Sequence, residues 1–159
     1  MKQIVGVADM KVSGSPGESL ITYSLGSCIG LVVYDSAVKV GGILHYMLPE
    51  SSLDTEKARM KPYMFADTGI PRLFKAAYQL GAKKPRMKVY VAGGAEILDQ
   101  SGFFNIGKRN YMALKKMLFR NNVMIDQQNV GGNNNRTVRI EITTGDIFVK
   151  TSGAKEVKV

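Results

Sequence analysis

The sequence is poor in the residues from which disulfides and zinc sites are built. Its 159 residues include one cysteine, Cys28, one histidine, His45, and no tryptophan. A single cysteine excludes an internal disulfide, which fits a reducing compartment. A zinc site would need two carboxylate ligands beside this cysteine and histidine, and no local cluster of acidic residues offers them. We therefore expect neither a metal nor another cofactor.

Long apolar runs are also missing. No segment approaches the length of a transmembrane helix, and the first ten residues, MKQIVGVADM, lack the apolar region and cleavage site of a signal peptide. We expect a cytoplasmic protein that does not insert into a membrane. The length and the hydrophobic content of 45% predict one domain over residues 1–159, with a frayed tail over 152–159.

Acidic residues are scarce after the first 50 positions. The formal net charge is +9, and residues 1–50 carry three basic against four acidic side chains, whereas the remaining 109 residues carry 19 against nine. A basic surface of this kind suits nucleic acid or an acidic protein partner. Because the basic residues are spread singly and in twos, without an interleaved aromatic platform, we do not expect nucleic-acid binding.

The apolar patterning predicts more strands than helices. Runs of β-branched and aromatic residues predict strands at 3–11, 20–25, 29–34, 40–47, 87–92, 123–127, 137–142 and 147–151. Helical periodicity predicts a helix over 61–80, kinked or divided at Pro71, and another over about 107–120. Residues 50–58 are interpreted as a polar loop. This pattern predicts a sheet-rich α+β sandwich.

The only cysteine and the only histidine fall on the two strands of one predicted hairpin. A turn of even length centred on Ser36-Ala37 places Cys28 directly opposite His45. Opposed residues have Cβ atoms roughly 4.5–5.5 Å apart, so the thiol and the imidazole would be within hydrogen-bond range. An odd turn, or a bulge at Gly41-Gly42, would instead turn one of the two side chains to the other face.

A thiol beside an imidazole is a candidate nucleophile with its base. Attack on a carbonyl carbon would give a thioester, and the same histidine could then activate water. Thr22, on the neighbouring strand, is the candidate hydroxyl that orients the ring, and Ser24 is the alternative. Backbone N–H groups at the Gly26-Ser27-Cys28 step can supply an oxyanion site. A lone cysteine or histidine beside an apolar strand is more often a structural residue, so composition and spacing leave both interpretations open.

Two glycine-rich stretches have both a structural and a functional interpretation. Gly93-Gly94-Ala95 follows a predicted strand but lacks the full glycine pattern and the acidic partner of a dinucleotide site. A tight turn with close backbone packing is therefore favoured over phosphate binding. The stretch from Gly131 to Asn135 is interpreted as a turn-rich loop, with a substrate-facing loop as the alternative.

Six short motifs occur in order over roughly residues 4–150. They are Thr22-x-x-x-Gly26-Ser27-Cys28, His45-x-Met47-Leu48-Pro49, Tyr63-x-x-Ala66-Asp67, Ala92-Gly93-Gly94-Ala95, Ile106-Gly107-x-Arg109-Asn110, and Gly131-Gly132 followed by Arg136. Each motif is weak alone, but the ordered set is specific, and it resembles that of the CheD family of chemoreceptor glutamine deamidases from bacterial and archaeal chemotaxis. The chain departs from the family at Asn129, where an acidic residue is frequent, and at Asn135, where glycine is usual.

The resemblance implies that Cys28 is the nucleophile, His45 the general base and acid, and Thr22 the ring-orienting hydroxyl. It implies an α/β/β layered sandwich with a Cys-His site, similar to toxin deamidases such as the cytotoxic necrotizing factors. The implied substrate is the carboxamide of specific glutamines on the cytoplasmic helices of methyl-accepting chemotaxis proteins. Hydrolysis of the glutamyl methyl ester through the same thioester is a further implied activity, and a CheC-type phosphatase is an implied partner.

The rival hypothesis is a non-catalytic adaptor that regulates a CheC-type phosphatase. If the protein is an enzyme, its basic surface should steer it toward acidic receptor helices and should lower the pKa of the thiol. The expected docking residues are Lys57, Arg59, Lys61, Lys108 and Arg109.

Overall fold

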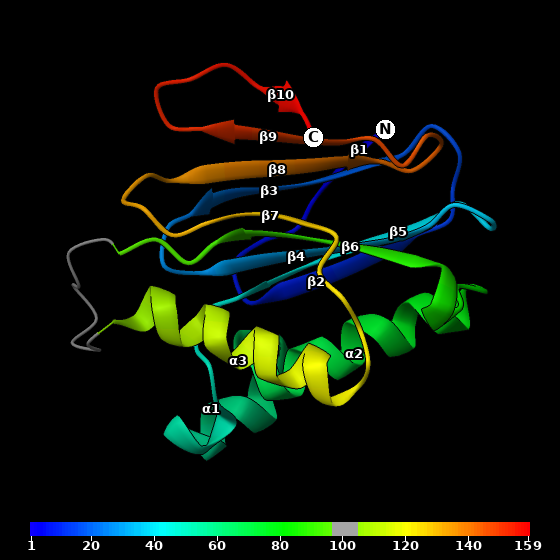
Figure 1. The fold of residues 1–159 in the computed structure, drawn as a ribbon. Coiled ribbons are helices and arrows are strands. Elements are labelled where there is room, and N and C mark those ends of the chain that lie inside the picture. The colour runs from blue at the N-terminus through cyan, green and yellow to red at the C-terminus, as the bar shows by residue number, and fades with distance from the viewer. Residues whose placement is uncertain (97–104) are drawn as a thin grey trace.

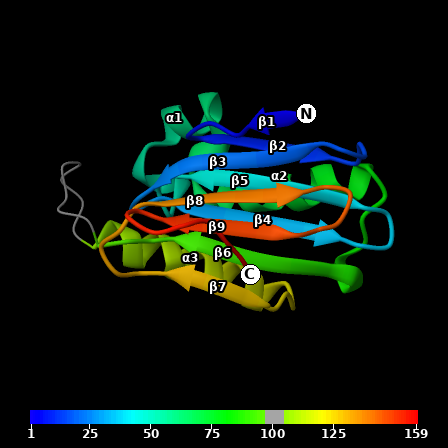
Figure 2. The same ribbon diagram turned by 90° about the horizontal axis from the view of Figure 1, so that it is seen from above.

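The computed structural model describes residues 1–96 and 105–159, and within them the chain forms three layers (Figure 1). The first sheet has the order β1 (Lys2–Ile4), β3 (Ser19–Leu25), β8 (Arg136–Glu141), β9 (Ile147–Thr151), β10 (Val157–Lys158). The second has the order β2 (Asp9–Ser13), β5 (Val40–Tyr46), β4 (Ile29–Asp35), β6 (Met87–Gly93), β7 (Gln127–Val130). The two sheets lie face to face, and Figure 2 shows the first sheet stacked over the second.

Helices cover the other face of the second sheet (Figure 1). The α-helices are α1 (Thr55–Met60), α2 (Ala66–Gln79) and α3 (Ile106–Arg120), and the short 3-10 helices are η1 (Ser51–Leu53), η2 (Pro62–Met64) and η3 (Lys84–Arg86). The predicted α/β/β layered sandwich is therefore confirmed.

The two larger apolar cores among the described residues lie between the three layers. Leu31, Leu44 and Leu73 belong to the core between the second sheet and the helices. Val32 and Ile43 belong to the core between the two sheets. Every residue of β4 and β5 is buried, because the second sheet is covered on both faces, and this explains why their sequences are almost continuously apolar.

The structure corrects the predicted N-terminal strand over residues 3–11. The first strand ends at Ile4, and a second one begins at Asp9. β1 pairs with β3 in the first sheet, and β2 pairs with β5 in the second. Ala8 has a φ of 58°, a left-handed conformation that interrupts an extended chain. One apolar run thus supplies a strand to each sheet.

The helical predictions are right for α3 and partly wrong before α2. The predicted polar loop over 50–58 contains α1, whose first turn is capped by the Asp54 carboxylate accepting from the Lys57 N–H at 3.0 Å. The helix predicted from Lys61 begins only at Ala66, because Pro62 lies in η2. Pro71 lies inside α2 without dividing it.

Of the later strands, the C-terminal hairpin of β8 and β9 is confirmed. The strand predicted over 123–127 is displaced to 127–130, where β7 pairs in parallel with β6. The tail from Ser152 was expected to be frayed, but Val157 and Lys158 pair with β9 as β10. No helix among the described residues is both long and apolar enough to span a membrane.

Candidate active site

Thr22 and His45 meet between the two sheets. Thr22 Oγ1 lies 2.7 Å from His45 Nδ1, and both side chains are fully buried. The sequence places Thr22 on a strand near His45, but β3 belongs to the first sheet and β5 to the second. The contact therefore crosses the space between the sheets rather than joining neighbours within one sheet.

The partners of Thr22 decide which nitrogen of His45 carries the proton. A hydroxyl has a single hydrogen to donate, and Thr22 donates it to the Val5 carbonyl at 2.8 Å. Toward His45 the hydroxyl must then accept, so the hydrogen lies on Nδ1. The other nitrogen, Nε2, keeps its lone pair and has no hydrogen-bond partner among the described residues. Nε2 is therefore the nitrogen of this imidazole that is free to accept a proton.

The register of the β4–β5 hairpin differs from the prediction. Gly30, not Cys28, lies opposite His45. The turn is shifted because the Asp35 carboxylate accepts from the Ala37 N–H at 2.9 Å, and β5 resumes only at Val40. Cys28 stands two residues before Gly30, just outside the strand, and packs against the core between the sheets. The shift is by two positions, so it keeps Cys28 on the side of the sheet that carries the imidazole.

Cys28 is partly exposed, as are Gly26 and Ser27 before it. The hydrogen bond expected between Cys28 and His45 is not formed, because His45 Nε2 has no partner among the described residues. Ser24, the alternative to Thr22, is exposed and has a φ of 59° at an irregularity in β3. The left-handed residue turns the Ser24 side chain outward and returns Leu25 to the core.

The backbone around Cys28 is held by the segment that follows β6. The Gly94 N–H donates to the Cys28 carbonyl and the Ala95 N–H donates to the Gly26 carbonyl, both at 2.9 Å. A Cβ on Gly93 would lie 2.1 Å from the Cys28 carbonyl oxygen, so only glycine permits this approach. The preferred interpretation of Gly93-Gly94-Ala95 as a tightly packed turn is confirmed.

Arg136 joins the Gly131 loop to the same segment. Its guanidinium donates to the Gly93 carbonyl at 3.2 Å, to the Gly131 carbonyl at 2.8 Å and to Asn129 Oδ1 at 2.9 Å. Asn129, one of the two departures from the family pattern, thus still provides an acceptor for this arginine. These bonds give the loop a structural role beside the Cys28 backbone.

Both groups of the candidate pair are electrically neutral in the resting site. Burial raises the pKa of the Cys28 thiol to about 11. Burial lowers the pKa of His45 to about 4. The expectation that basic surroundings lower the pKa of the thiol is wrong, because burial of the thiol is the largest effect and raises its pKa. The site therefore holds a neutral thiol and a neutral imidazole, not a thiolate and an imidazolium.

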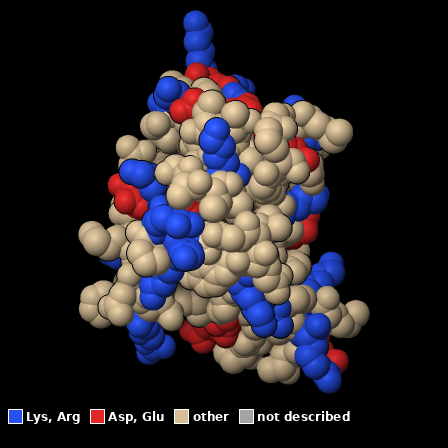
Figure 3. Space-filling model, turned by 90° about the vertical axis from the view of Figure 1, so that its right-hand side faces the viewer, with Lys and Arg blue, Asp and Glu red and all other residues tan. Residues whose placement is uncertain are grey.

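Basic side chains are not concentrated at the site. The five expected docking residues are all exposed, and α1 and the first turn of α3 lie toward the end of the molecule where β4 begins (Figures 1 and 2). At the opposite end, where the β4–β5 turn lies, Figure 3 shows further lysine and arginine side chains with acidic ones between them. Basic side chains are therefore exposed at both of these ends of the molecule.

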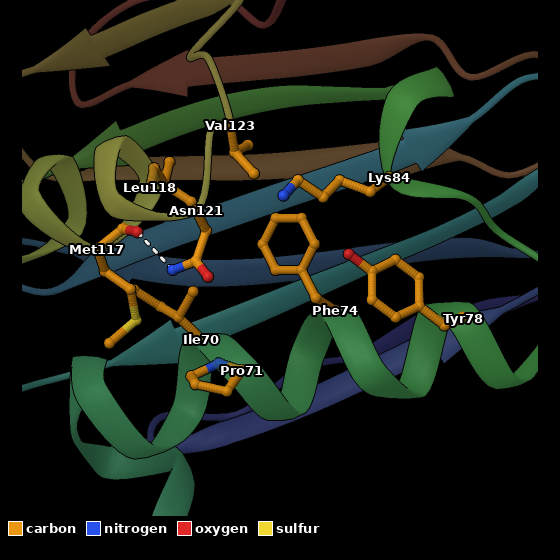
Figure 4. A pocket seen from close by; sticks show the side chains of 9 residues that line it. All are labelled: Ile70, Pro71, Phe74, Tyr78, Lys84, Met117, Leu118, Asn121 and Val123. Atoms are coloured by element: carbon orange, nitrogen blue, oxygen red, sulfur yellow. Dashed lines mark hydrogen bonds between the residues drawn. The ribbon is translucent and has the colours of Figure 1, made fainter.

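A separate cavity of about 220 Å³ lies on the helix side of the second sheet (Figure 4). Phe74 and Tyr78 of α2 line it together with Met117 of α3. The cavity holds neither the cysteine nor the histidine, so we do not assign the chemistry to it. Among the residues that the structure describes, no three His, Cys, Asp or Glu side chains gather as they would around a metal ion.

Comparison with known proteins matches residues 47–151 to the family described as CheD chemotactic sensory transduction. "Probable chemoreceptor glutamine deamidase CheD 1" of Syntrophus aciditrophicus is 59% identical over 150 residues, which cover 94% of each chain. "Probable chemoreceptor glutamine deamidase CheD" of Solibacter usitatus is 48% identical over 153 residues, 96% of this chain and 90% of that protein. A protein of Anaeromyxobacter dehalogenans, "Probable chemoreceptor glutamine deamidase CheD 2", is 42% identical over 147 residues, 92% of each. Unlike the family match, the first two relatives' matches extend over nearly the whole chain.

Proposed function

Because the chain belongs to the CheD family, we propose that it is a chemoreceptor glutamine deamidase that works through a thioester on Cys28. The observation that carries this proposal is the 2.7 Å contact between Thr22 Oγ1 and His45 Nδ1. That contact makes Nε2 the basic nitrogen on the sheet face shared with Cys28. Thr22 acts through the ring and is a positioning residue.

In the first half of the reaction, Cys28 Sγ attacks the side-chain carbonyl carbon of a receptor glutamine. The thiol proton passes to His45 Nε2 as the carbon–sulfur bond forms. The tetrahedral intermediate then collapses, the carbon–nitrogen bond breaks, and the imidazolium returns the proton to the departing nitrogen. Ammonia leaves, and the glutamyl group remains on the sulfur as a thioester.

In the second half, water attacks the thioester. His45 Nε2 accepts a proton from the water, and the carbon–sulfur bond breaks as the carboxyl product forms. The proton returns to the sulfur, which restores the neutral thiol. The same thioester would form from a glutamyl methyl ester with methanol as the leaving group, so ester hydrolysis belongs to this proposal.

The Gly26 N–H, also expected at the oxyanion, instead donates to the Ser24 carbonyl at 3.0 Å. We therefore assign the oxyanion to the N–H groups of Ser27 and Cys28. In a trans peptide unit the C=O and the following N–H point in opposite directions. The carbonyls of Gly26 and Ser27 are bonded to Ala95 and Asn110, on the side of β6 and α3. The N–H groups of Ser27 and Cys28 therefore point away from that side, and neither has an acceptor on another described residue. Two such donors can stabilise the charge that develops on the substrate oxygen.

The proposed substrates are the cytoplasmic helices of methyl-accepting chemotaxis proteins, so the proposed place of action is the cytoplasm. The docking surface is proposed among the exposed residues Lys57, Arg59, Lys61, Lys108 and Arg109. A CheC-type phosphatase is the proposed regulatory partner. The proposed substrate and regulatory partner are taken from the resemblance to the CheD family. The proposed chemistry at Cys28 does not depend on them.

Mass spectrometry of a chemoreceptor fragment incubated with the protein tests the proposal. The wild type should convert specific glutamines to glutamates, and the Cys28→Ala variant should leave every glutamine unchanged. An unmodified receptor, together with undiminished regulation of a CheC-type phosphatase, would instead support the adaptor hypothesis.

A further inference from the structure

Asn110 ties the backbone before the nucleophile to the strand that carries the base. Its carboxamide Nδ2 donates to the Ser27 carbonyl at 3.0 Å and to the Met47 carbonyl at 2.8 Å. Ser27 immediately precedes Cys28, and Met47 follows the end of β5, two residues after His45. A carboxamide nitrogen has two hydrogens, so both are committed to these bonds.

The position of Asn110 is itself fixed by its surroundings. The residue is fully buried in the first turns of α3, and its backbone carbonyl accepts from the Tyr46 hydroxyl at 2.7 Å. The start of α3 lies so close to the end of β6 that a Cβ on Gly107 would be 2.2 Å from the Ala95 carbonyl oxygen. Helix, strand and nucleophile loop therefore form one packed unit in which the amide cannot turn away without leaving carbonyls unpaired.

The bond to Ser27 determines where the next N–H points. The Ser27 C=O and the Cys28 N–H belong to one peptide unit, so a carbonyl held toward Asn110 directs that N–H the opposite way. The flanking carbonyls of Gly26 and Cys28 accept from backbone N–H groups. The carbonyls of Gly26, Ser27 and Cys28 therefore all accept hydrogen bonds, and Asn110 supplies the one to Ser27.

We propose that Asn110 is a positioning residue for the deamidase reaction, and that it directs the Cys28 N–H at the oxyanion. This inference rests on the proposed function. The carboxamide is buried and does not touch the substrate, so it acts on the chemical step and not on substrate binding. Its effect should be specific to reactions that develop charge on a carbonyl oxygen.

The test compares Asn110→Leu, which keeps the side-chain volume without the donors, with the matched variant Asn121→Leu. Asn121 follows the same helix and donates to the Met117 carbonyl at its exposed end. Asn110→Leu should lower kcat for receptor deamidation by about 10- to 100-fold. This decrease is no larger than the decrease in kcat that follows removal of a whole oxyanion donor. Its KM should stay near the wild-type value, and Asn121→Leu should retain wild-type kcat.

Alkylation of Cys28 by iodoacetamide distinguishes a positioning role from a general disturbance of the site. In this reaction the sulfur displaces iodide, and no oxyanion forms. We expect Asn110→Leu to be alkylated at the wild-type rate. A wild-type kcat in Asn110→Leu, or a parallel loss of deamidation and alkylation, would overturn the inference.

Asn110→Asp provides a second measurement if the leucine variant does not fold. An ionised carboxylate has no hydrogen to donate and would face two carbonyl oxygens, whereas the protonated acid can restore one bond. The deamidase activity of Asn110→Asp should therefore rise as the pH falls through the pKa of the buried carboxyl, and a wild-type pH profile would contradict this. Failure of the proposed function itself is distinguishable, since wild type would then be inactive or Cys28→Ala would remain active.

Discussion

At the scale of single residues, the protonation states of Cys28 and His45 decide how the sulfur is activated. With the pKa of the thiol raised to about 11 and that of the imidazole lowered to about 4, both groups are neutral across the physiological range. Little thiolate exists at neutral pH, so in the proposed reaction the thiol proton leaves during attack. This requires a base with a free lone pair, which His45 has at Nε2.

The first prediction concerns the reactivity of the free thiol. Because burial raises the pKa of Cys28, the rate of its alkylation by iodoacetamide should keep rising through pH 9 and 10, toward about 11. The label should be absent from Cys28→Ala, which has no other cysteine. A rate that reaches its plateau near neutral pH would show a stabilised thiolate and contradict the neutral pair.

The second prediction concerns the hydroxyl that orients the imidazole. Thr22→Val keeps the branched shape but removes both the acceptor for His45 Nδ1 and the donor to Val5. We expect kcat to fall by roughly 100-fold, part of what a positioned general base contributes. Thr22→Ser should recover most of the loss. Equal kcat in the valine variant and the wild type would remove Thr22 from the site.

At the scale of the elements, the site depends on close contact between the end of β6 and the start of α3. The third prediction is that Gly107→Ala destabilises the fold by about 1–3 kcal/mol, the usual effect of overpacking. The new Cβ would approach the Ala95 and Gly94 carbonyl oxygens to 2.2 and 2.7 Å. Urea unfolding measures the change.

Gly6→Ala is the matched control for this substitution. Its Cβ would have only the Asp9 Cβ at 4.0 Å within reach, so its effect should stay within about 0.5 kcal/mol. Equal stability of the two variants would show that α3 can move away from β6 without cost.

The elements also show what could be predicted from the sequence. The apolar pattern of the sequence is sufficient to predict β4 and β5, where every residue is buried. It is also sufficient to predict α3, whose apolar stripe is clear. The register of the hairpin could not be predicted, because it depends on the Asp35 side chain entering the turn. The division of residues 3–11 between two sheets was missed because the left-handed conformation falls on Ala8, a residue that does not signal a turn.

The candidate site was only partly accessible to sequence reasoning. The sequence places Cys28 and His45 at one hairpin, but Gly30 rather than Cys28 lies opposite His45. The contact of Thr22 with His45 spans two sheets, and Asn110 reaches Ser27 over a separation of 83 residues. Such contacts depend on the packing of the layers, and no local pattern encodes them. The ordered motif set contained Asn110 but gave no reason for it.

At the scale of the whole molecule, the net charge of +9 bears on association with the receptor. The fourth prediction is that the double variant Lys57→Glu/Lys61→Glu raises KM for the receptor roughly tenfold with little change in kcat, because charge steers encounter without entering the chemistry. Steady-state kinetics at low salt measures this, and added salt should reduce the difference.

Lys88→Glu is the control for charge alone. Lys88 is exposed on β6 and pairs with Tyr34, at the end of β4 away from Cys28. The variant should keep a KM near that of the wild type. Lys88→Glu changes the net charge by two units and the double variant by four, so an increase in KM for Lys88→Glu in proportion to its charge change would show that only total charge matters.

The most direct test of the account is to trap the acyl-enzyme. When the protein is mixed with a glutamine-containing receptor peptide and quenched in acid, intact-mass analysis should show an adduct of enzyme plus peptide minus ammonia. The adduct should map to Cys28 and be released by hydroxylamine, as a thioester is. Conversion of glutamine to glutamate without such an adduct, and undiminished in Cys28→Ala, would contradict the account.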